Sequence, residues 1–455
     1  MPLVFIHGVN TRSTDADYTR GVEARRMMFD QLAARKIRER YPGFRVADDV
    51  YWGDLGVDFL WRLRSIPDIR QKYAQGPEGD EIENPDLLAL MIQPAEGKKP
   101  DEKREHLGAA QPLAEAARRD PARLVRALFA GEADRFAPPL FRPPALSGKQ
   151  TVEPESAVAQ GENLGLLLMA VDQFARKVAE QPGLIQGATD SDVLAAIQNG
   201  IDDQYRSTFE TARADREQMP GDKEHLGKIS DGIGWTRNYL KKAVEDARDF
   251  VSKQATAVAR DASLELSGWL RDPLSRKGLR FLGDVLVYLH HGIRRLEGST
   301  GSESIYDRVR SKLLALKQAE KKEPLVVVTH SFGSEILYDL LTSGGLKDLD
   351  DIDLWVTVGA QTSLFAEMRL FAWMAKNIPE DTEAFTLGLP PKVKNWVNFY
   401  DPADVLSYMH GPVFGKVKDI AVDDGGNLKN AHGHYFVTTS FYENVLKELQ
   451  EALPK

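Results

Sequence analysis

The chain has 455 residues, more than one ordinary domain, and its hydrophobic share of 42% and charged share of 28% are typical of soluble globular proteins. The net charge of −9 argues against non-specific nucleic-acid binding, and the absence of cysteine excludes disulfides, cysteine-ligated metals and a thiol nucleophile. Neither zinc-finger spacing nor a Walker-type phosphate loop occurs. We therefore expect neither a metal nor a cofactor, and no nucleic-acid partner.

The N-terminus begins with a short apolar run, residues 3–6, that predicts a buried strand and ends at His7 and Gly8. A loop at this place can offer a backbone N–H to a developing negative charge, from Val9 or from Asn10. We expect His7 to orient this loop rather than to transfer protons.

A helix at 21–40 and a strand at 46–52 should follow, after which the strand pattern stops. Four later stretches show apolar residues at helical spacing: 118–129, 162–180, 191–216 and 235–270. The charged stretch 95–104 should be a loop. The sequence thus predicts a core formed by 1–55 and 277–455, interrupted by a helical insertion at 56–276.

The insertion should emerge near the strand ends, where ligands bind in α/β sheets. We expect it to be a cap or lid that controls access to a site. The alternative is a helical appendage that completes the fold or forms an oligomer interface. The oligomeric state itself is left open by the sequence.

The most informative stretch is 325–337, LVVVTHSFGSEIL. An apolar, β-branched run stops at Ser331, Gly333 follows two residues later, and an amphipathic helix begins. This layout is typical of a nucleophile elbow, a strand–turn–helix that exposes one serine hydroxyl. The N–H of Phe332, at the start of the helix, is suited to bind an oxyanion. His330 should fill the variable position before the serine.

Carboxylates and imidazoles follow the elbow in order. A further strand-like run ends at Asp401 and Asp404, and His432 and His434 stand near the C-terminus. A serine hydroxyl needs an imidazole to take its proton, and the imidazole needs a carboxylate to fix its tautomer. Either aspartate and either histidine could supply these groups.

The remaining expected elements of the core are helices at 278–297, 304–320, 332–342, 364–377 and 441–453, and strands at 325–329, 353–359 and 393–400.

With these motifs in this order, the chain resembles the α/β-hydrolase superfamily, on its lipase and esterase side. The resemblance implies an α/β fold with a mostly parallel sheet flanked by helices. It favours Asp404 as the acid, because an apolar residue follows it, and His432 as the base, because an aromatic residue follows three positions later. Asp401, which precedes a proline, is more typical of a turn. The family usually has glycine where this chain has Thr329.

We therefore expect a serine hydrolase that cleaves a carboxylic or lipid ester through Ser331, His432 and Asp404. A different hypothesis, motivated by Thr329 and by the size of the insertion, is a weakened hydrolase fold that acts as a binding or scaffold module. A third is an acyltransferase that uses the same triad, because hydrolysis and transfer share the acyl-enzyme.

No signal peptide and no apolar run long enough to cross a bilayer are visible, which predicts a cytoplasmic protein without a transmembrane segment. Export by a secretion machine that needs no such signal is compatible with the same sequence. The apolar stretch 364–377 leaves a transient contact with a membrane surface open.

Overall fold

The computed structural model describes twelve parts of the chain: residues 2–15, 17–58, 87, 111–129, 154–217, 232–257, 280–291, 303–319, 324–371, 378–379, 385–422 and 431–453. The loop predicted at 95–104 and the last part of the helix predicted at 364–377 lie outside these ranges.

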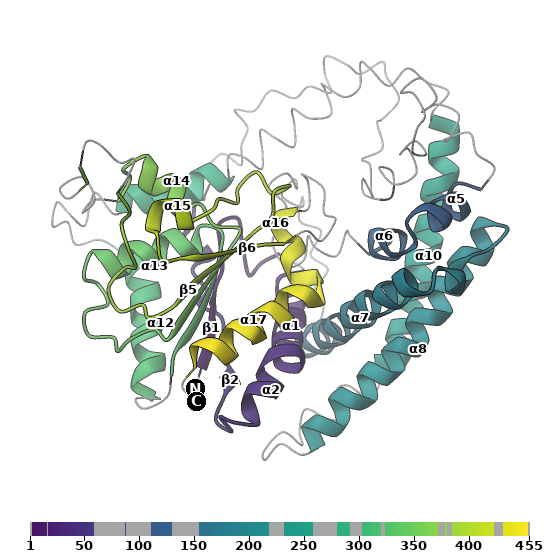
Figure 1. Ribbon diagram of the computed structural model, residues 1–455, viewed down its shortest axis with the longest axis horizontal. Coiled ribbons are helices and arrows are strands. Elements are labelled where there is room, and N and C mark those ends of the chain that lie inside the picture. The colour runs from purple at the N-terminus through teal and green to yellow at the C-terminus, as the bar shows by residue number, and fades with distance from the viewer. Residues whose placement is uncertain are drawn as a thin grey trace.

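A six-stranded sheet, parallel at every pair of neighbouring strands, forms the centre of the molecule (Figure 1). In one of these pairs, Leu3 lies opposite Val326. The predicted α/β class is confirmed. The strand order across the sheet is β2 (Arg45–Val46), β1 (Pro2–Ile6), β3 (Val326–His330), β4 (Leu354–Val358), β5 (Trp396–Tyr400) and β6 (Lys418–Ala421).

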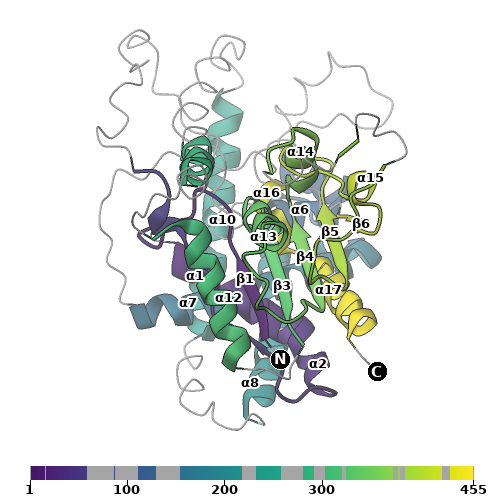
Figure 2. The ribbon, with the colours of Figure 1, turned by 90° about the vertical axis from the view of Figure 1, so that its left-hand side faces the viewer.

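Helices cover both faces of this sheet. One face carries α1 (Tyr18–Phe29) and α17 (Thr439–Ala452), and the other carries α12 (Ile305–Ala319) and α13 (Gly333–Thr342). Figure 2 shows α12 and α13 in front of the strands. The other labelled elements are η1 (Asp30–Ala34), α2 (Arg35–Arg38), η2 (Gly53–Leu55), α5 (Pro112–Arg119), α6 (Pro121–Ala127), α7 (Pro154–Glu180), η6 (Pro182–Ile185), α8 (Asp190–Glu217), α10 (Gly232–Ala257), α14 (Thr362–Glu367), α15 (Gly411–Phe414), α16 (Ala431–His434) and η8 (Tyr435–Val437). Residues 280–291 are also helical.

The continuous apolar strands follow from this double cover. Alternate side chains of a strand point to opposite faces, so a strand with helices on both sides is apolar throughout. In β3, Val326 and Val328 belong to the core beneath α1 and α17, whereas Val327 belongs to the core beneath α12 and α13. All three are fully buried.

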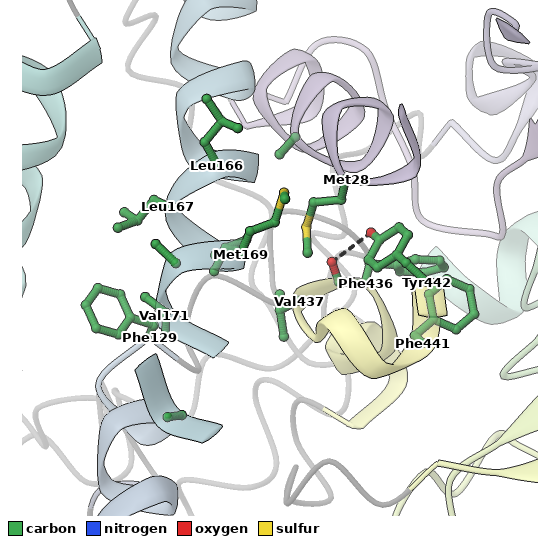
Figure 3. Close-up of a cluster of buried hydrophobic side chains, with 14 of the residues drawn as sticks. Met28, Phe129, Leu166, Leu167, Met169, Val171, Phe436, Val437, Phe441 and Tyr442 are labelled. Atoms are coloured by element: carbon green, nitrogen blue, oxygen red, sulfur yellow. Dashed lines mark hydrogen bonds between the residues drawn. The ribbon is translucent and has the colours of Figure 1, made fainter. Parts of the chain in front are cut away.

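The described helices of the 56–276 segment form a further layer on the α1 and α17 side. Helix α7 lies close to α1, because a Cβ added at Gly165 would come within 2.7 Å of the Ala24 carbonyl oxygen. Figure 3 shows one apolar cluster that joins Met169 of α7, Met28 of α1 and Val437 of η8. These helices therefore share one hydrophobic core with the sheet.

Two elements differ from the sequence prediction near the N-terminal half. The helix expected at 118–129 is two helices, because Asp120 caps α6 by accepting a bond from the Arg123 N–H (3.0 Å) and Pro121 starts the new helix. The strand expected at 46–52 is reduced to β2 and one bridge between Ile6 and Val50.

The strand is interrupted at Asp48 and Asp49. The N–H groups of residues 47 and 50, on either side, still donate to carbonyl oxygens of β1 (both 2.8 Å), so the chain stays beside β1. The two carboxylates form ion pairs with Arg26 and Arg25 of α1.

Later elements also differ. In the described part of the stretch 364–377, the helix is α14, and Arg369 after it lies in the left-handed region (φ 55°), which ends helical geometry. Helix α10 occupies the first part of the stretch 235–270, whose last part lies outside the described ranges. Strand β6 was not predicted, because its four residues, two charged followed by two apolar, show no alternating pattern and lie at the edge of the sheet.

The order of the strands indicates where a ligand would bind. The chain moves from β1 to β2 in one direction and from β1 through β3 to β6 in the other, so the connecting helices α1 and α13 lie on opposite faces. Ligands bind in the crevice that such a reversal opens at the carboxyl ends of the strands. Among the residues that the structure describes, no helix is both long and apolar enough to span a bilayer.

Candidate active site

The loops that follow β1, β3, β4 and β5 meet at the carboxyl edge of the sheet. Gly8, after β1, lies against the serine after β3: a Cβ added at Gly8 would come within 2.6 Å of the Ser331 Cβ and 3.2 Å of its Oγ. A Cβ added at Gly359, after β4, would come within 3.0 Å of Asp404 Oδ2, after β5, and 3.3 Å of His432 Nδ1, after β6. Parallel strands therefore bring together residues that are far apart in the sequence.

Ser331 occupies a strained turn between β3 and α13. Its φ is 51°, a left-handed conformation that residues other than glycine rarely adopt, and its N–H donates to the Val358 carbonyl (2.9 Å). Gly333 allows this turn to approach β1, because a Cβ there would lie 2.7 Å from the carbonyl oxygens of Ile6 and His7. Strain of this kind is concentrated at functional sites.

Thr329, two residues before Ser331, fits into the turn despite its branched side chain. Its hydroxyl bonds to Ser334 Oγ at 2.8 Å and accepts a bond from Trp355 Nε1 at 2.9 Å. The side chain is fully buried. Since both polar contacts are satisfied, the β-branched residue links β3, β4 and α13 without preventing the turn at Ser331.

His432 and Asp404 form a buried pair beside the elbow. The Nδ1 of His432 lies 2.9 Å from Asp404 Oδ2, and the two side chains are 9% and 1% exposed. A carboxylate accepts a hydrogen bond, so Nδ1 carries the proton in the neutral ring and Nε2 is left as the basic atom. Asp404 also accepts a bond from the Leu406 N–H at Oδ1 (3.0 Å), which fixes the carboxylate.

Asp401, the alternative acid, holds a turn instead. Its Oδ1 accepts a bond from the Ala403 N–H at 2.7 Å, a local turn of the kind expected for Asp before proline. Its own N–H donates to the Tyr435 hydroxyl (2.9 Å), and that hydroxyl donates to Asp404 Oδ2 (3.0 Å). The structure thus brings Asp404, and not Asp401, to the imidazole of His432.

His434, the alternative base, lies on the other side of α16. Burial lowers its pKa to about 4, with Arg126 nearby as a second cause. It lies near Arg126 of α6 and Asp172 of α7, and the Asp172 carboxylate also binds Thr439 at the start of α17. His434 therefore faces the helical segment rather than Ser331.

His330 holds the loop that carries His432. Its Nε2 donates to the His432 carbonyl oxygen at 2.8 Å, and the two rings lie 4.6 Å apart between centroids. Burial lowers the pKa of His330 well below its ordinary value, and the proximity of His432 adds to this effect. His330 is thus neutral, and it does more than fill a variable position.

His7 is held by hydrogen bonds at both ring nitrogens. Burial lowers its pKa to about 3. Its Nε2 accepts a bond from the Trp52 N–H (3.1 Å), so its Nδ1 carries the proton and donates to the Gly8 carbonyl (2.6 Å). The ring also stacks on the Trp52 indole. His7 therefore fixes the start of the loop after β1.

Of the three N–H groups predicted as oxyanion donors, two remain candidates. The Asn10 N–H donates to the Asp284 carboxylate (2.8 Å) and is not available to a substrate. Within the described ranges, no protein atom accepts a hydrogen bond from the N–H of Val9 or of Phe332. These two groups flank Ser331, one in the loop beside it and one directly after it.

Two charged residues at the site were missed by the sequence analysis. Asp284 is described below. Glu335, one turn after Ser331 on α13, accepts bonds at Oε1 from the Gln361 N–H and the Thr362 hydroxyl, both at 3.0 Å. Burial raises the pKa of Glu335 to about 8. The only signal in the sequence is a lone glutamate in an otherwise apolar stretch of helix.

Ser331 Oγ is buried and has no hydrogen-bond partner among the residues that the structure describes. Hydrogen bonds between a nucleophile and its base are often long without substrate and tighten when substrate binds. In the part of the chain that the structure describes, no three histidine, aspartate or glutamate side chains are grouped as a metal site. Comparisons with protein-family models, with curated proteins and with solved structures gave no match.

Proposed function

We propose that this protein is a serine hydrolase of the α/β-hydrolase type that cleaves a carboxylic or lipid ester. The observation that carries the proposal is the buried His432–Asp404 pair beside Ser331, whose φ of 51° is that of a nucleophile elbow. The parallel sheet, the site at its carboxyl edge and the order of serine, aspartate and histidine along the chain support the same reading.

The residues have distinct tasks in this mechanism. Ser331 Oγ attacks the ester carbonyl, while His432 Nε2 takes the hydroxyl proton. Asp404 holds Nδ1–H and stabilises the imidazolium that forms. The tetrahedral intermediate collapses to an acyl-enzyme when His432 returns the proton to the leaving alcohol. Water, activated in the same way by His432, then releases the acid and restores the serine.

The negative charge of the tetrahedral intermediate is assigned to the N–H groups of Val9 and Phe332. Phe332 directly precedes α13, so its N–H belongs to the positive end of the helix dipole. Removing one such donor lowers kcat by about 10²–10³ in comparable enzymes.

Exposed apolar side chains support a substrate with an apolar acyl group. Val405 and Met409, in the loop after Asp404, are 53% and 47% exposed, and Met368 and Leu370, after α14, are 49% and 42% exposed. These loops follow β4 and β5 and therefore lie at the edge of the sheet that carries Asp404. A charged, water-soluble substrate would gain little free energy of binding from these apolar side chains.

The test is intact-mass spectrometry after incubation with an alkyl fluorophosphonate, which phosphonylates activated serines. We expect one adduct on the wild-type protein and none on Ser331→Ala. Ser334→Ala is the matched control, because it removes a buried hydroxyl three residues later, in the helix that follows the turn, and it should keep the adduct. A wild-type protein that stays folded and unlabelled, with detergent as well as without it, would contradict the proposal and favour a binding module.

A further inference from the structure

Asp284 is a fully buried carboxylate whose bonds all reach residues distant in the sequence. Its Oδ2 accepts bonds from the Asn10 N–H (2.8 Å) and Arg12 Nη1 (3.1 Å). Its Oδ1 accepts bonds from Arg12 Nη2 (2.6 Å) and the Val57 N–H (2.7 Å). Its charge is thus paired with one guanidinium, and both oxygens are satisfied.

The backbone around Asp284 leaves room for its carboxylate. A Cβ added at Gly56 would come within 2.3 Å of Asp284 Oδ1, so only glycine allows the approach. Asn10 is held in the left-handed region (φ 60°), a conformation that asparagine tolerates better than most residues. The bond from its N–H to a charged acceptor stabilises that conformation.

These contacts fix the loop that carries one proposed oxyanion donor. Val9 lies between Gly8, which contacts Ser331, and Asn10, which binds Asp284. His7 fixes the same loop from its other end through Trp52. Contacts on both sides of Val9 therefore fix the direction of its N–H.

The helical segment 280–291 also reaches the second donor. Tyr288 follows Asp284 by four residues, so the two side chains lie on the same face of the helix. The Tyr288 ring meets the Phe332 ring edge to face, with centroids 5.4 Å apart, and its hydroxyl donates to Asp339 of α13 (2.7 Å). One helix thus contacts both segments that carry the N–H groups.

We propose that Asp284 is a positioning residue that holds the loop of Val9 and Asn10 in the geometry needed to bind the oxyanion. This inference rests on the proposed function. Asp284 touches no reacting atom. It acts by holding a backbone donor in place before the charge develops, so that no reorganisation is needed during the reaction.

Steady-state hydrolysis of p-nitrophenyl butyrate by the full chain tests the proposal. For Asp284→Ala we expect kcat to fall by about 10²-fold with KM changed less than about threefold, because the loop acts on the transition state. Asp284→Asn keeps one carbonyl oxygen for the Asn10 N–H but loses the charge that pairs with Arg12. The kcat of Asp284→Asn should lie between that of the wild type and that of Asp284→Ala.

Asp353→Asn is the matched control. Asp353 is also a buried carboxylate that accepts a bond from a distant backbone N–H, that of Leu325 (2.9 Å), and one from Lys394 Nζ (2.8 Å). It precedes β4 and lies at the opposite edge of the sheet. This variant should lose stability and keep kcat. If Asp284→Ala lowers kcat no more than Asp353→Asn does, the inference is wrong.

A second measurement separates this inference from the proposed function. Hydrogen–deuterium exchange reports directly on the Asn10 amide, and we expect it to speed up at least tenfold in Asp284→Ala but not in Asp353→Asn. If the wild type neither hydrolyses the ester nor reacts with a fluorophosphonate, the proposed function fails. Exchange then shows whether Asp284 holds the loop. If exchange speeds up while kcat is unchanged in an active enzyme, the positioning role is refuted and the hydrolase remains.

Discussion

Tyr435 donates a hydrogen bond to the same Asp404 oxygen, Oδ2, that accepts the bond from His432. The Tyr435 hydroxyl also accepts a bond from the Asp401 N–H, so it links the two aspartates of this loop. A tyrosine one turn after the histidine therefore sets the position of the carboxylate that orients that histidine.

We expect Tyr435→Phe to lower kcat/KM about tenfold, which corresponds to the loss of one hydrogen bond to a charged acceptor, about 1.5 kcal/mol. Tyr442→Phe is the control, because the Tyr442 hydroxyl donates to the Phe436 carbonyl (2.9 Å) and has no contact with the pair. It should change the unfolding free energy and leave kcat/KM unchanged. Ester hydrolysis and urea denaturation of both variants decide between these outcomes.

The choice of acid can be tested by two isosteric changes. Asp404→Asn replaces an acceptor of His432 Nδ1–H by an amide and should lower kcat by about 10³–10⁴. Asp401→Asn keeps the carbonyl oxygen that accepts the Ala403 N–H, so the turn and the activity should survive. Equal losses in the two variants would show that the loop, and not the carboxylate, is what matters.

The choice of base has a similar pair of variants. His432→Ala should lower kcat by about 10⁴ or more, and it should abolish labelling of Ser331 by a fluorophosphonate. His434→Ala removes an imidazole that faces Arg126 and Asp172, so it should lower stability and leave labelling intact. A labelled His432→Ala protein would remove His432 from the mechanism.

Substitution of Gly359 tests whether the His432–Asp404 pair tolerates a closer neighbour. A Cβ at this position would lie 3.0 Å from Asp404 Oδ2 and 3.3 Å from His432 Nδ1, and the residue has a φ of 55°. We expect Gly359→Ala to lower kcat at least tenfold. Gly344→Ala adds the same backbone strain (φ 78°) where a Cβ would meet nothing within 4 Å. It should cost about 1 kcal/mol of stability and no activity.

Stability should depend on pH through Glu335. Burial raises its pKa from 4.5 to about 8, so the folded protein binds this proton more tightly than the unfolded chain does. The contribution of Glu335 to the unfolding free energy is fully present below about pH 4.5 and is lost as the pH rises to about 8. In this range the unfolding free energy falls with a slope that approaches about 1.4 kcal/mol per pH unit.

Glu335→Gln removes this proton while keeping an oxygen for the Gln361 N–H and the Thr362 hydroxyl. The unfolding free energy of the wild type minus that of the variant should therefore fall between pH 5 and pH 8. Buried neutral histidines such as His7 titrate in both proteins, so their effect cancels in the difference. Urea denaturation at several pH values measures it, and a flat difference would contradict the prediction.

Local patterns predicted the elements that local residues determine. The run before Ser331 is a buried strand, and the helix after it begins where expected, because β-branched and amphipathic patterns report directly on strands and helices. The structure pairs His432 with Asp404, the two residues that the sequence analysis preferred over His434 and Asp401.

The residues that the sequence analysis missed act over long distances. Asp284 binds Asn10 across 274 positions and Glu335 binds Gln361 across 26, and neither contact leaves a local pattern. The same limit explains the strand expected at 46–52. Its apolar residues suit a strand, but the pairing with β1 is interrupted at Asp48 and Asp49, whose side chains form ion pairs with α1.

The pairing of β1 with β3 sets when the site can form during folding. Leu3 meets Val326, so more than three hundred residues must be enclosed before Ser331 reaches the loop after β1. The entropy lost in closing a chain grows with its length, and contacts between distant segments slow folding. A growing chain would carry Gly8 out of the ribosome long before Ser331 existed. Catalytic competence should therefore appear abruptly, late in synthesis, and no N-terminal fragment that stops before the elbow should possess it.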